Sequence, residues 1–279
     1  MPFTRDELID WVQSRIDEVA PLPESVALSP VKIGQELDEA ASFVLRSVPK
    51  QFVYPVAEPY IVGPFLRLVD DKPYSLVFPL PPLFSTLNGA TTVLTGQFLR
   101  FIRMQLTFWQ RPADDLMGVD STEYRQRLNR WSRSVALNPT AALIPFVFTA
   151  APSPTLSVSF RQAIEAFPPP DDMAEYQLDT TTTGYDNGSA TGLKLYKVTD
   201  LAAGKKNILG EFLIVRYMAA ENVPPALIDP VVWYAASNCL TSLRQSAEAQ
   251  KALEKYAIAT KGIRIGMKGE DIPVLPQAK

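Results

Sequence analysis

The only cysteine of the chain, Cys239, lies in the stretch PVVWYAASNCLTSLRQ, where a thiol beside aromatic and polar residues could serve as a catalytic nucleophile. Such a nucleophile ordinarily needs a neighbouring base, most often a histidine, and the sequence contains no histidine. Around the thiol, Trp233, Ala236, Leu240 and Leu243 recur at helical spacing. We therefore expect Cys239 to be a small buried residue of a packed helix.

Metal and cofactor chemistry is restricted by the same composition. Zinc, copper and non-haem iron sites use imidazole or several thiolates, and one cysteine without any histidine supplies neither. Magnesium or calcium binding through oxygen ligands stays open, as does carboxylate chemistry. The sequence also lacks a Walker-type phosphate loop. We expect no cofactor, no metal and no enzymatic activity.

Three adjacent aspartate pairs are the remaining candidates for chemistry: Asp70–Asp71, Asp114–Asp115 and Asp171–Asp172. A glycosidase needs two carboxyl groups that face one sugar, which neighbouring loop residues seldom do. Aspartate before a turn is common because it hydrogen-bonds the local backbone, so we favour a turn role for each pair. The alternative function is a carbohydrate-binding or carbohydrate-active protein that uses these aspartates and exposed aromatic residues.

Arginines and aromatic residues are interleaved from Arg100 to Arg133. This pattern could belong to a protein interface, a solvent-exposed face or a nucleic-acid-binding surface, and we favour a protein interface. The basic stripe is broken, because Arg125 and Arg127 do not share a helix face. A net charge of −3 also argues against a dedicated nucleic-acid surface. The predicted protein-interface residues are Phe108, Trp109, Arg111, Tyr124, Arg127 and Trp131, with Ile272, Val274 and Leu275 near the C-terminus.

The two ends of the chain have helical patterns. Thr4 and Glu7 have capping-box spacing before an apolar stripe that ends at Val19, and Ser29–Pro30 begins a second helix that ends near Val48. Residues 228–243 and 246–260 repeat the helical period. We expect N- and C-terminal helical hairpins at residues 1–53 and 224–268.

The middle of the chain, residues 54–223, favours strands. YSLVFPL, AALIPFVF, TLSVSF and EFLIVRYM are typical of strands, and residues 101–108 alternate with a period of two. The flanks AEYQLD and LKLYKV predict a hairpin around the polar residues 180–192. We expect short helices near residues 63–68, 121–133 and 161–166.

These elements predict an α+β fold in which the two helical hairpins form a four-helix bundle and the centre is an antiparallel β-rich insertion. The proline-rich residues 269–279 are expected to form an extended tail that docks on a neighbouring subunit. No stretch reaches about 18 uninterrupted apolar residues, so we expect no membrane span. The 25 prolines favour short elements with rigid connections.

The order of short motifs resembles a family of tailed-phage virion proteins, the head–tail connector (adaptor or ring) proteins of crAss-like podoviruses and their relatives. The motifs are a strand that ends in Trp109-Gln110-Arg111-Pro112-Ala113, a helix start at Asp120–Tyr124, Asn138-Pro139 before an apolar strand, and paired helices from Trp233 to Lys255. They cover most of the chain in order and carry no catalytic residues.

The resemblance implies a connector subunit that sits beneath the portal in a ring, usually of twelve copies, with its helical bundle around a DNA channel. The implied partners are further copies of the chain, the portal protein, other connector or tail proteins, and genomic DNA that passes without sequence-specific binding. The implied location is the neck or tail region of a virion assembled in the host cytoplasm. Mild acidity suits a channel in which DNA slides without sticking.

Overall fold

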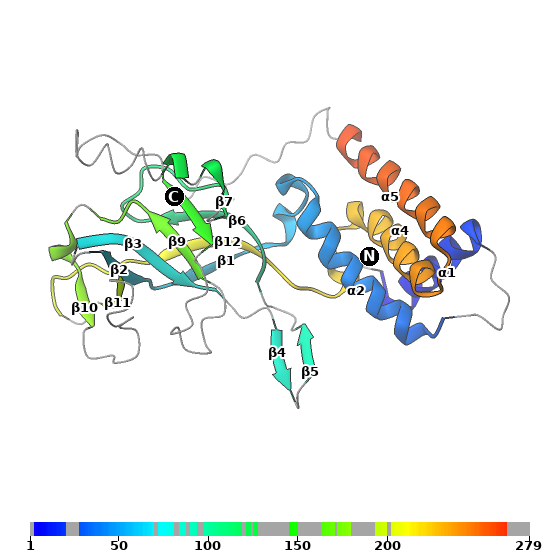
Figure 1. Ribbon diagram of the computed structural model, residues 1–279, viewed down its shortest axis with the longest axis horizontal. Coiled ribbons are helices and arrows are strands. Elements are labelled where there is room, and N and C mark those ends of the chain that lie inside the picture. The colour runs from blue at the N-terminus through cyan, green and yellow to red at the C-terminus, as the bar shows by residue number, and fades with distance from the viewer. Residues whose placement is uncertain are drawn as a thin grey trace. The chain divides into compact units, whose positions relative to one another are not determined.

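The computed structural model describes residues 3–20, 28–69, 72–80, 84–87, 90–93, 98–118, 121–123, 125–127, 145–149, 163–170, 172–179, 193–199 and 202–266. The described chain is mixed α+β, with sheets that are mainly antiparallel. It divides into a helical unit, Met1–Val56 with Tyr217–Lys279, and a β unit, Ala57–Arg216. Figure 1 gives the order of the elements along the chain.

Helix α1 spans Arg5–Val19 and begins with the predicted capping box. The Thr4 hydroxyl accepts a hydrogen bond from the Glu7 amide, and the Glu7 carboxylate accepts one from the Thr4 amide at 2.7 Å. Both bonds satisfy amides that have no partner inside the helix, which fixes where the helix starts. The apolar stripe then buries Leu8, Ile9, Val12 and Ile16.

Helix α2 spans Pro30–Ser47, with Ser29 as its N-cap and proline in its first turn, as predicted. Its stripe is buried from Ile33 to Val48. Pro49 follows, and the chain continues through two 3₁₀ turns, η2 at Lys50–Phe52 and η3 at Tyr54–Val56.

Helices α4, Pro225–Ser242, and α5, Ser246–Gly266, return to the helical unit after the 3₁₀ turn η5 at Ala220–Asn222. Helix α4 packs against α1, α2 and α5, and Figure 1 shows it between α2 and α5. A helix that contacts neighbours on several sides must be apolar around most of its circumference. Its buried residues accordingly occupy more than one face: Leu227, Ile228, Pro230, Val231, Val232, Trp233, Ala235, Ala236, Ser237, Cys239 and Leu240.

Two arginines of α1 connect it to the rest of the helical unit. Arg5 donates two hydrogen bonds to the Asp38 carboxylate of α2, at 2.8 and 3.1 Å. Arg15 lies over the Trp233 ring of α4, 4.8 Å from its centroid, and pairs with Asp229. Because the charges of both ion pairs are partly exposed, they mainly orient α1 and add little stability.

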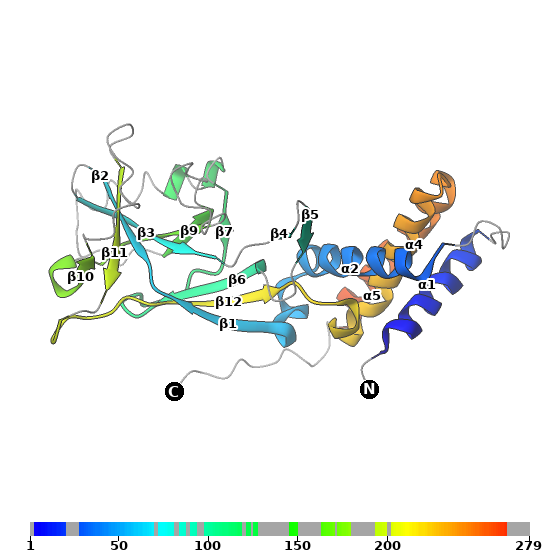
Figure 2. The same cartoon turned by 90° about the horizontal axis from the view of Figure 1, so that it is seen from below.

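The β unit contains three sheets in its described residues. In the first, β12 (Gly210–Arg216) lies between β1 (Ala57–Val62) and β6 (Phe98–Leu106), as Figure 2 shows. The second has the order β10 (Gln177–Asp179), β11 (Leu193–Thr199), β2 (Phe65–Val69), β3 (Lys72–Pro79), β9 (Ala163–Phe167), β8 (Phe146–Thr149) and β7 (Leu116–Met117), with only β7 and β8 parallel. The third is the hairpin β4 (Phe84–Leu87) and β5 (Ala90–Val93).

One core joins the first two sheets. Leu76 and Phe78 of the seven-stranded sheet belong to the same buried cluster as Met104 and Phe212 of the three-stranded sheet. The strand predicted at residues 101–108 is confirmed up to Leu106 as part of β6, whose pairing with β12 has two register shifts. At one shift Ile102 is an extra residue of β6, so Phe101 and Ile102 are both buried, and at the other Leu99 is the extra residue beside the buried Phe98.

Two of the predicted short helices are wrong. Residues 63–68 contain most of β2, which pairs with β3 on one side and β11 on the other. Residues 161–166 overlap β9, which pairs with β3 and β8. In both segments the hydrogen bonds come from distant strands, and this tertiary pairing overrides the local preference that suggested a helix.

Other predictions are confirmed where the structure describes them. Strand β3 contains most of the predicted strand YSLVFPL, and β8 contains the end of AALIPFVF. Strand β12 contains most of EFLIVRYM. Strands β10 and β11, which pair with each other, lie in the predicted hairpin flanks AEYQLD and LKLYKV. Thr122, Glu123 and Arg125–Arg127 are helical. The predicted strand TLSVSF, the polar loop 180–192 and the tail 269–279 lie outside the described residues. No helix among the residues that the structure describes is long and apolar enough to span a bilayer.

Candidate interaction surfaces

The Cys239 thiol is buried in α4, as predicted. Burial raises its pKa to about 12, with a smaller contribution from Glu36 of α2. A thiol with this pKa is almost entirely protonated at neutral pH and is therefore a poor nucleophile. Cys239 is a packing residue.

The described aspartates of the predicted pairs do not form a catalytic arrangement. Asp172 caps the 3₁₀ turn η4, Met173–Glu175, where its side chain accepts a hydrogen bond from the Ala174 amide at 2.8 Å. This is the predicted turn role. Asp114 and Asp115 are adjacent exposed residues, whereas Asp70, Asp71 and Asp171 lie outside the described residues. No group of metal-ligating side chains occurs within the described ranges.

The predicted interface residues of the β unit fall into different environments. Trp109 is only 6% exposed, and its indole Nε1 donates to the Pro168 carbonyl at 3.0 Å, so it is a core residue and offers no surface to a partner. Phe108 packs half-buried against the same core. Arg111 is exposed, and Arg127 pairs with Glu123 one helical turn away at 2.7 Å. Of this predicted set, Tyr124, Trp131, Ile272, Val274 and Leu275 lie outside the described residues.

The hairpin β4–β5 differs from the other strands of the β unit. Among the described residues β4 and β5 pair only with each other. An isolated two-stranded hairpin is marginally stable in water, because a single ladder buries little apolar surface. Within the part of the chain that the structure describes, no further strand pairs with either outer edge of the hairpin.

The sequence of this region favours pairing with another strand. Residues 73–99 include both hairpin strands and contain no charged residue, although one residue in five of the whole chain is charged. Neither β4 nor β5 contains proline. Proteins ordinarily protect exposed edge strands with charges or proline, so an uncharged edge of this kind is adapted to a partner or prone to aggregation. The sequence signal for the hairpin was Asn88-Gly89, the residue pair typical of two-residue hairpin turns.

The helical unit has its own candidate surface, an aromatic cluster formed by Phe43 of α2, Tyr234 of α4 and Tyr256 of α5. The Phe43 and Tyr234 rings stack with centroids 4.1 Å apart and planes 8° apart. Tyr256 meets Tyr234 edge to face at 5.4 Å, and its hydroxyl lies 3.3 Å from that of Ser47. Phe43 is 41% exposed, so one side of the cluster faces solvent.

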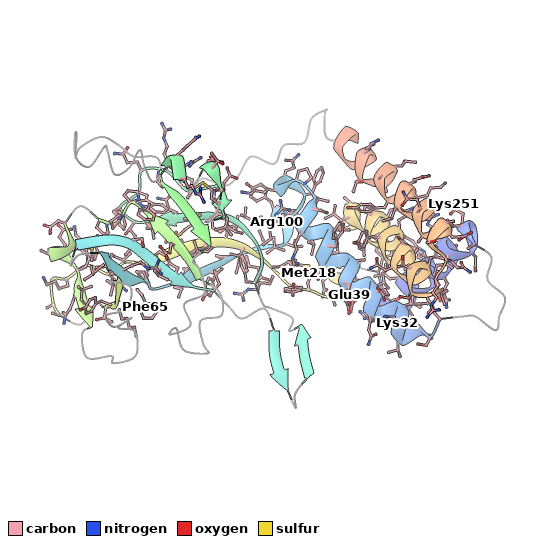
Figure 3. All side chains as sticks on the ribbon, viewed as in Figure 1. Lys32, Glu39, Phe65, Arg100, Met218 and Lys251 are labelled. Atoms are coloured by element: carbon pink, nitrogen blue, oxygen red, sulfur yellow. The ribbon has the colours of Figure 1, made fainter. Side chains whose placement is uncertain are left out.

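Electrostatics around the aromatic cluster are mild. Glu39 is exposed on α2, one helical turn before Phe43. Figure 3 labels Glu39 on this helix. Burial raises the pKa of the Tyr234 phenol, and the neighbouring Tyr256 and Glu39 raise it further. The phenol is therefore neutral and offers an apolar ring with a polar tip, a combination that is common in protein interfaces.

No protein-family model matches this chain, and no curated protein matches it. The likeness to phage connector proteins therefore rests on the sequence motifs, and the surfaces described above have to be interpreted from their own chemistry.

Proposed function

We propose that this chain is a non-enzymatic structural subunit of a tailed-phage virion, a head–tail connector that joins the portal to the tail as a ring of identical copies. The proposal places the ring, of twelve copies in the family that the sequence resembles, in the virion neck after assembly in the host cytoplasm. The portal protein and other connector or tail proteins are its neighbours. Genomic DNA passes through the ring without sequence-specific binding, which suits a net charge of −3.

The observation that carries this proposal is the hairpin β4–β5, with which no further strand pairs among the described residues. Its outer edges present backbone donors and acceptors without the charges or prolines that prevent strand addition. Addition of a strand from another chain satisfies those groups, a recognition mode that many protein assemblies use. A ring of identical subunits supplies such a strand from the next copy at every position.

The finer architecture is part of the same proposal. Helices α1, α2, α4 and α5 pack through α4, and the β unit is continuous in sequence between η3 and η5. We propose that the four helices form a four-helix bundle that carries the β unit as an insertion, with residues 269–279 as an extended tail. A bundle made from both ends of the chain holds the two ends of the insertion at fixed positions.

The carbohydrate alternative has less support. Asp172 is engaged as a cap, and Asp114 and Asp115 are neighbours in sequence on an exposed segment. Two carboxyl groups that cleave a glycosidic bond must instead flank it at a separation of about 5–10 Å. Glycan binding or release that is lost in Asp114→Ala or Asp171→Ala would favour this alternative over the connector.

A proline substitution in the hairpin tests the proposal. Leu87 pairs with Ala90, two residues further along the chain, and a closing pair of this spacing exchanges its backbone hydrogen bonds within the hairpin. Because hydrogen-bonded and non-hydrogen-bonded pairs alternate, the amides of the next pair, Thr86 and Thr91, are expected to point outward. Thr91→Pro removes an outward donor and leaves the bonds inside the hairpin in place. Thr91→Val keeps the amide and serves as the matched control.

The readout is particle mass by light scattering, together with far-ultraviolet circular dichroism to verify folding. We expect the parent chain and Thr91→Val to form one multi-copy species of defined mass, and Thr91→Pro to be folded but monomeric. A parent chain that is monomeric at every concentration, or a Thr91→Pro variant that assembles like the parent, would contradict the role given to the hairpin.

A further inference from the structure

The aromatic cluster of Phe43, Tyr234 and Tyr256 joins three helices while part of its ring surface stays exposed. The Phe43–Tyr234 stack and the edge contact of Tyr256 already join α2, α4 and α5, yet Phe43 remains 41% exposed. Rings that are held rigidly by neighbours and exposed on one side bind a partner with little loss of conformational entropy. This arrangement is the usual basis of recognition of extended, proline-rich peptides, which lay their rings on aromatic side chains.

The sequence of this chain contains one segment with the matching chemistry outside the described residues. Residues 267–279 read MKGEDIPVLPQAK, in which Pro273 and Pro276 have PxxP spacing around Val274 and Leu275. PxxP segments adopt polyproline II helices, whose backbone is already restricted before binding. The segment follows α5 directly, and Tyr256 of the aromatic cluster lies on α5.

We propose that the aromatic cluster of one copy binds the C-terminal segment, residues 269–279, of a second copy of this chain. The inference rests on the proposed function, because a ring supplies the second copy, and it names the site that the tail occupies. Pro273 and Pro276 pack on the exposed face of Phe43 and the edges of the two tyrosines. Val274 and Leu275 add apolar contact.

The direction of α5 favours a second copy over the same copy, although the tail is long enough for either. Tyr256 lies ten residues before Gly266, so α5 carries the chain about 15 Å beyond the aromatic cluster. The seven residues from Gly266 to Pro273 add a reach of roughly 22 Å when extended. A tail that returns to its own aromatic cluster must reverse direction, whereas a tail that continues outward meets the next copy of a ring.

A photocrosslinking experiment on the full chain tests the inference. Leu275 is replaced by p-benzoylphenylalanine, and isotopically light and heavy copies are mixed before irradiation. Mass spectrometry then identifies the crosslinked peptides. We expect adducts between light and heavy copies that contain Phe43, Tyr234 or Tyr256.

Variants make the result specific to the aromatic cluster. Phe43→Ala is expected to lower the crosslink yield about tenfold, because a rigid aromatic anchor is removed. Phe43→Leu, which keeps apolar volume, serves as a second variant in case the alanine disturbs α2. Val31→Ala, at a residue of the same helix that is 74% exposed, is the matched control and should leave the yield unchanged.

The outcomes separate this inference from the proposed function. If particle mass shows a ring but adducts form only within one copy, form elsewhere, or are insensitive to Phe43→Ala, the tail site is wrong and the connector proposal stands. If particle mass shows only monomers and no adduct joins two copies, both proposals fail. A ring together with Phe43-dependent adducts between copies supports both.

Discussion

Arg67 of β2 and Glu165 of β9 form an ion pair inside the β unit, although β3 lies between their strands. Ser75 of β3 donates a hydrogen bond to the other carboxylate oxygen of Glu165 at 3.0 Å. Burial raises the pKa of Glu165, while Arg67 and Ser75 oppose that shift. Three neighbouring strands thus share one buried polar cluster, which specifies their order more than it adds stability.

Glu165→Ala should lower the free energy of unfolding by about 3–5 kcal/mol, because Arg67 then stays largely buried without its carboxylate partner. Urea unfolding followed by circular dichroism measures the change. The double variant Arg67→Met/Glu165→Leu removes both charges and should recover most of the loss. A single variant that is as stable as the double would show that the ion pair does not hold the sheet in the way proposed.

The same cluster predicts a pH dependence. Since the folded pKa of Glu165 lies above its ordinary value of 4.5, the folded protein retains this proton at pH values where the unfolded chain has released it. The contribution of Glu165 to stability is therefore greatest below the ordinary value and declines as pH rises through the folded pKa. We expect the free energy of unfolding of the parent, measured relative to Glu165→Gln, to fall over that interval. A rise would contradict the assigned direction.

Gly210 lies at the start of β12, where it passes over two buried rings. A Cβ at this position would lie 2.6 Å from Cε1 of Phe78 and 2.7 Å from Cε2 of Phe212. Neither ring has room to move in a packed core, so Gly210→Ala should lower the free energy of unfolding by about 1–3 kcal/mol. Gly63→Ala, whose Cβ would meet no atom within 4 Å, is the control in thermal unfolding. Equal melting temperatures for the two variants would oppose this packing.

Cys239 should resist thiol reagents in the native state. Its buried side chain has a pKa raised to about 12, so both thiolate formation and access are suppressed. With a chromogenic disulfide reagent near pH 8, we expect labelling only after denaturant is added. Stoichiometric labelling of the folded chain within minutes would mean that this part of α4 is accessible.

Substitution of Trp109 should lower stability, whereas substitution of Arg111 should leave it nearly unchanged. Trp109→Phe removes the indole donor from the Pro168 carbonyl and should lower the free energy of unfolding by about 1–3 kcal/mol. Arg111→Ala is at an exposed position and should change stability by less than about 0.5 kcal/mol. Calorimetric melting of both variants measures the difference. A marked loss of stability in Arg111→Ala would assign that residue to the fold as well.

Elements with local signals could be predicted from the sequence. Thr4 and Ser29 mark helix starts because their side chains satisfy nearby amides, and those bonds are present. Strands β2 and β9 could not be assigned in the same way. Phe65 and Ile164 are buried because strands that are distant in the sequence pair with β2 and β9. The residues next to Phe65 or Ile164 in the sequence do not show which distant strands will pair with them.

The candidate surfaces were harder to predict, for the same physical reason. Phe43, Tyr234 and Tyr256 come from three helices, and only the packing of α4 against its neighbours brings the rings together. Trp109 beside Arg111 resembled an interface sequence, but the fold turns the indole into the core. The sequence indicated which residue types were available, and tertiary packing decided which of them remained exposed.

Particle images of the chain co-expressed with a portal protein encoded beside it in the same genome provide the most direct test of the proposed connector function. The connector proposal predicts closed rings of this chain seated on the portal, visible by negative-stain electron microscopy in end-on and side views. Portal rings that carry no additional density, together with a chain that elutes separately as a monomer, would contradict it.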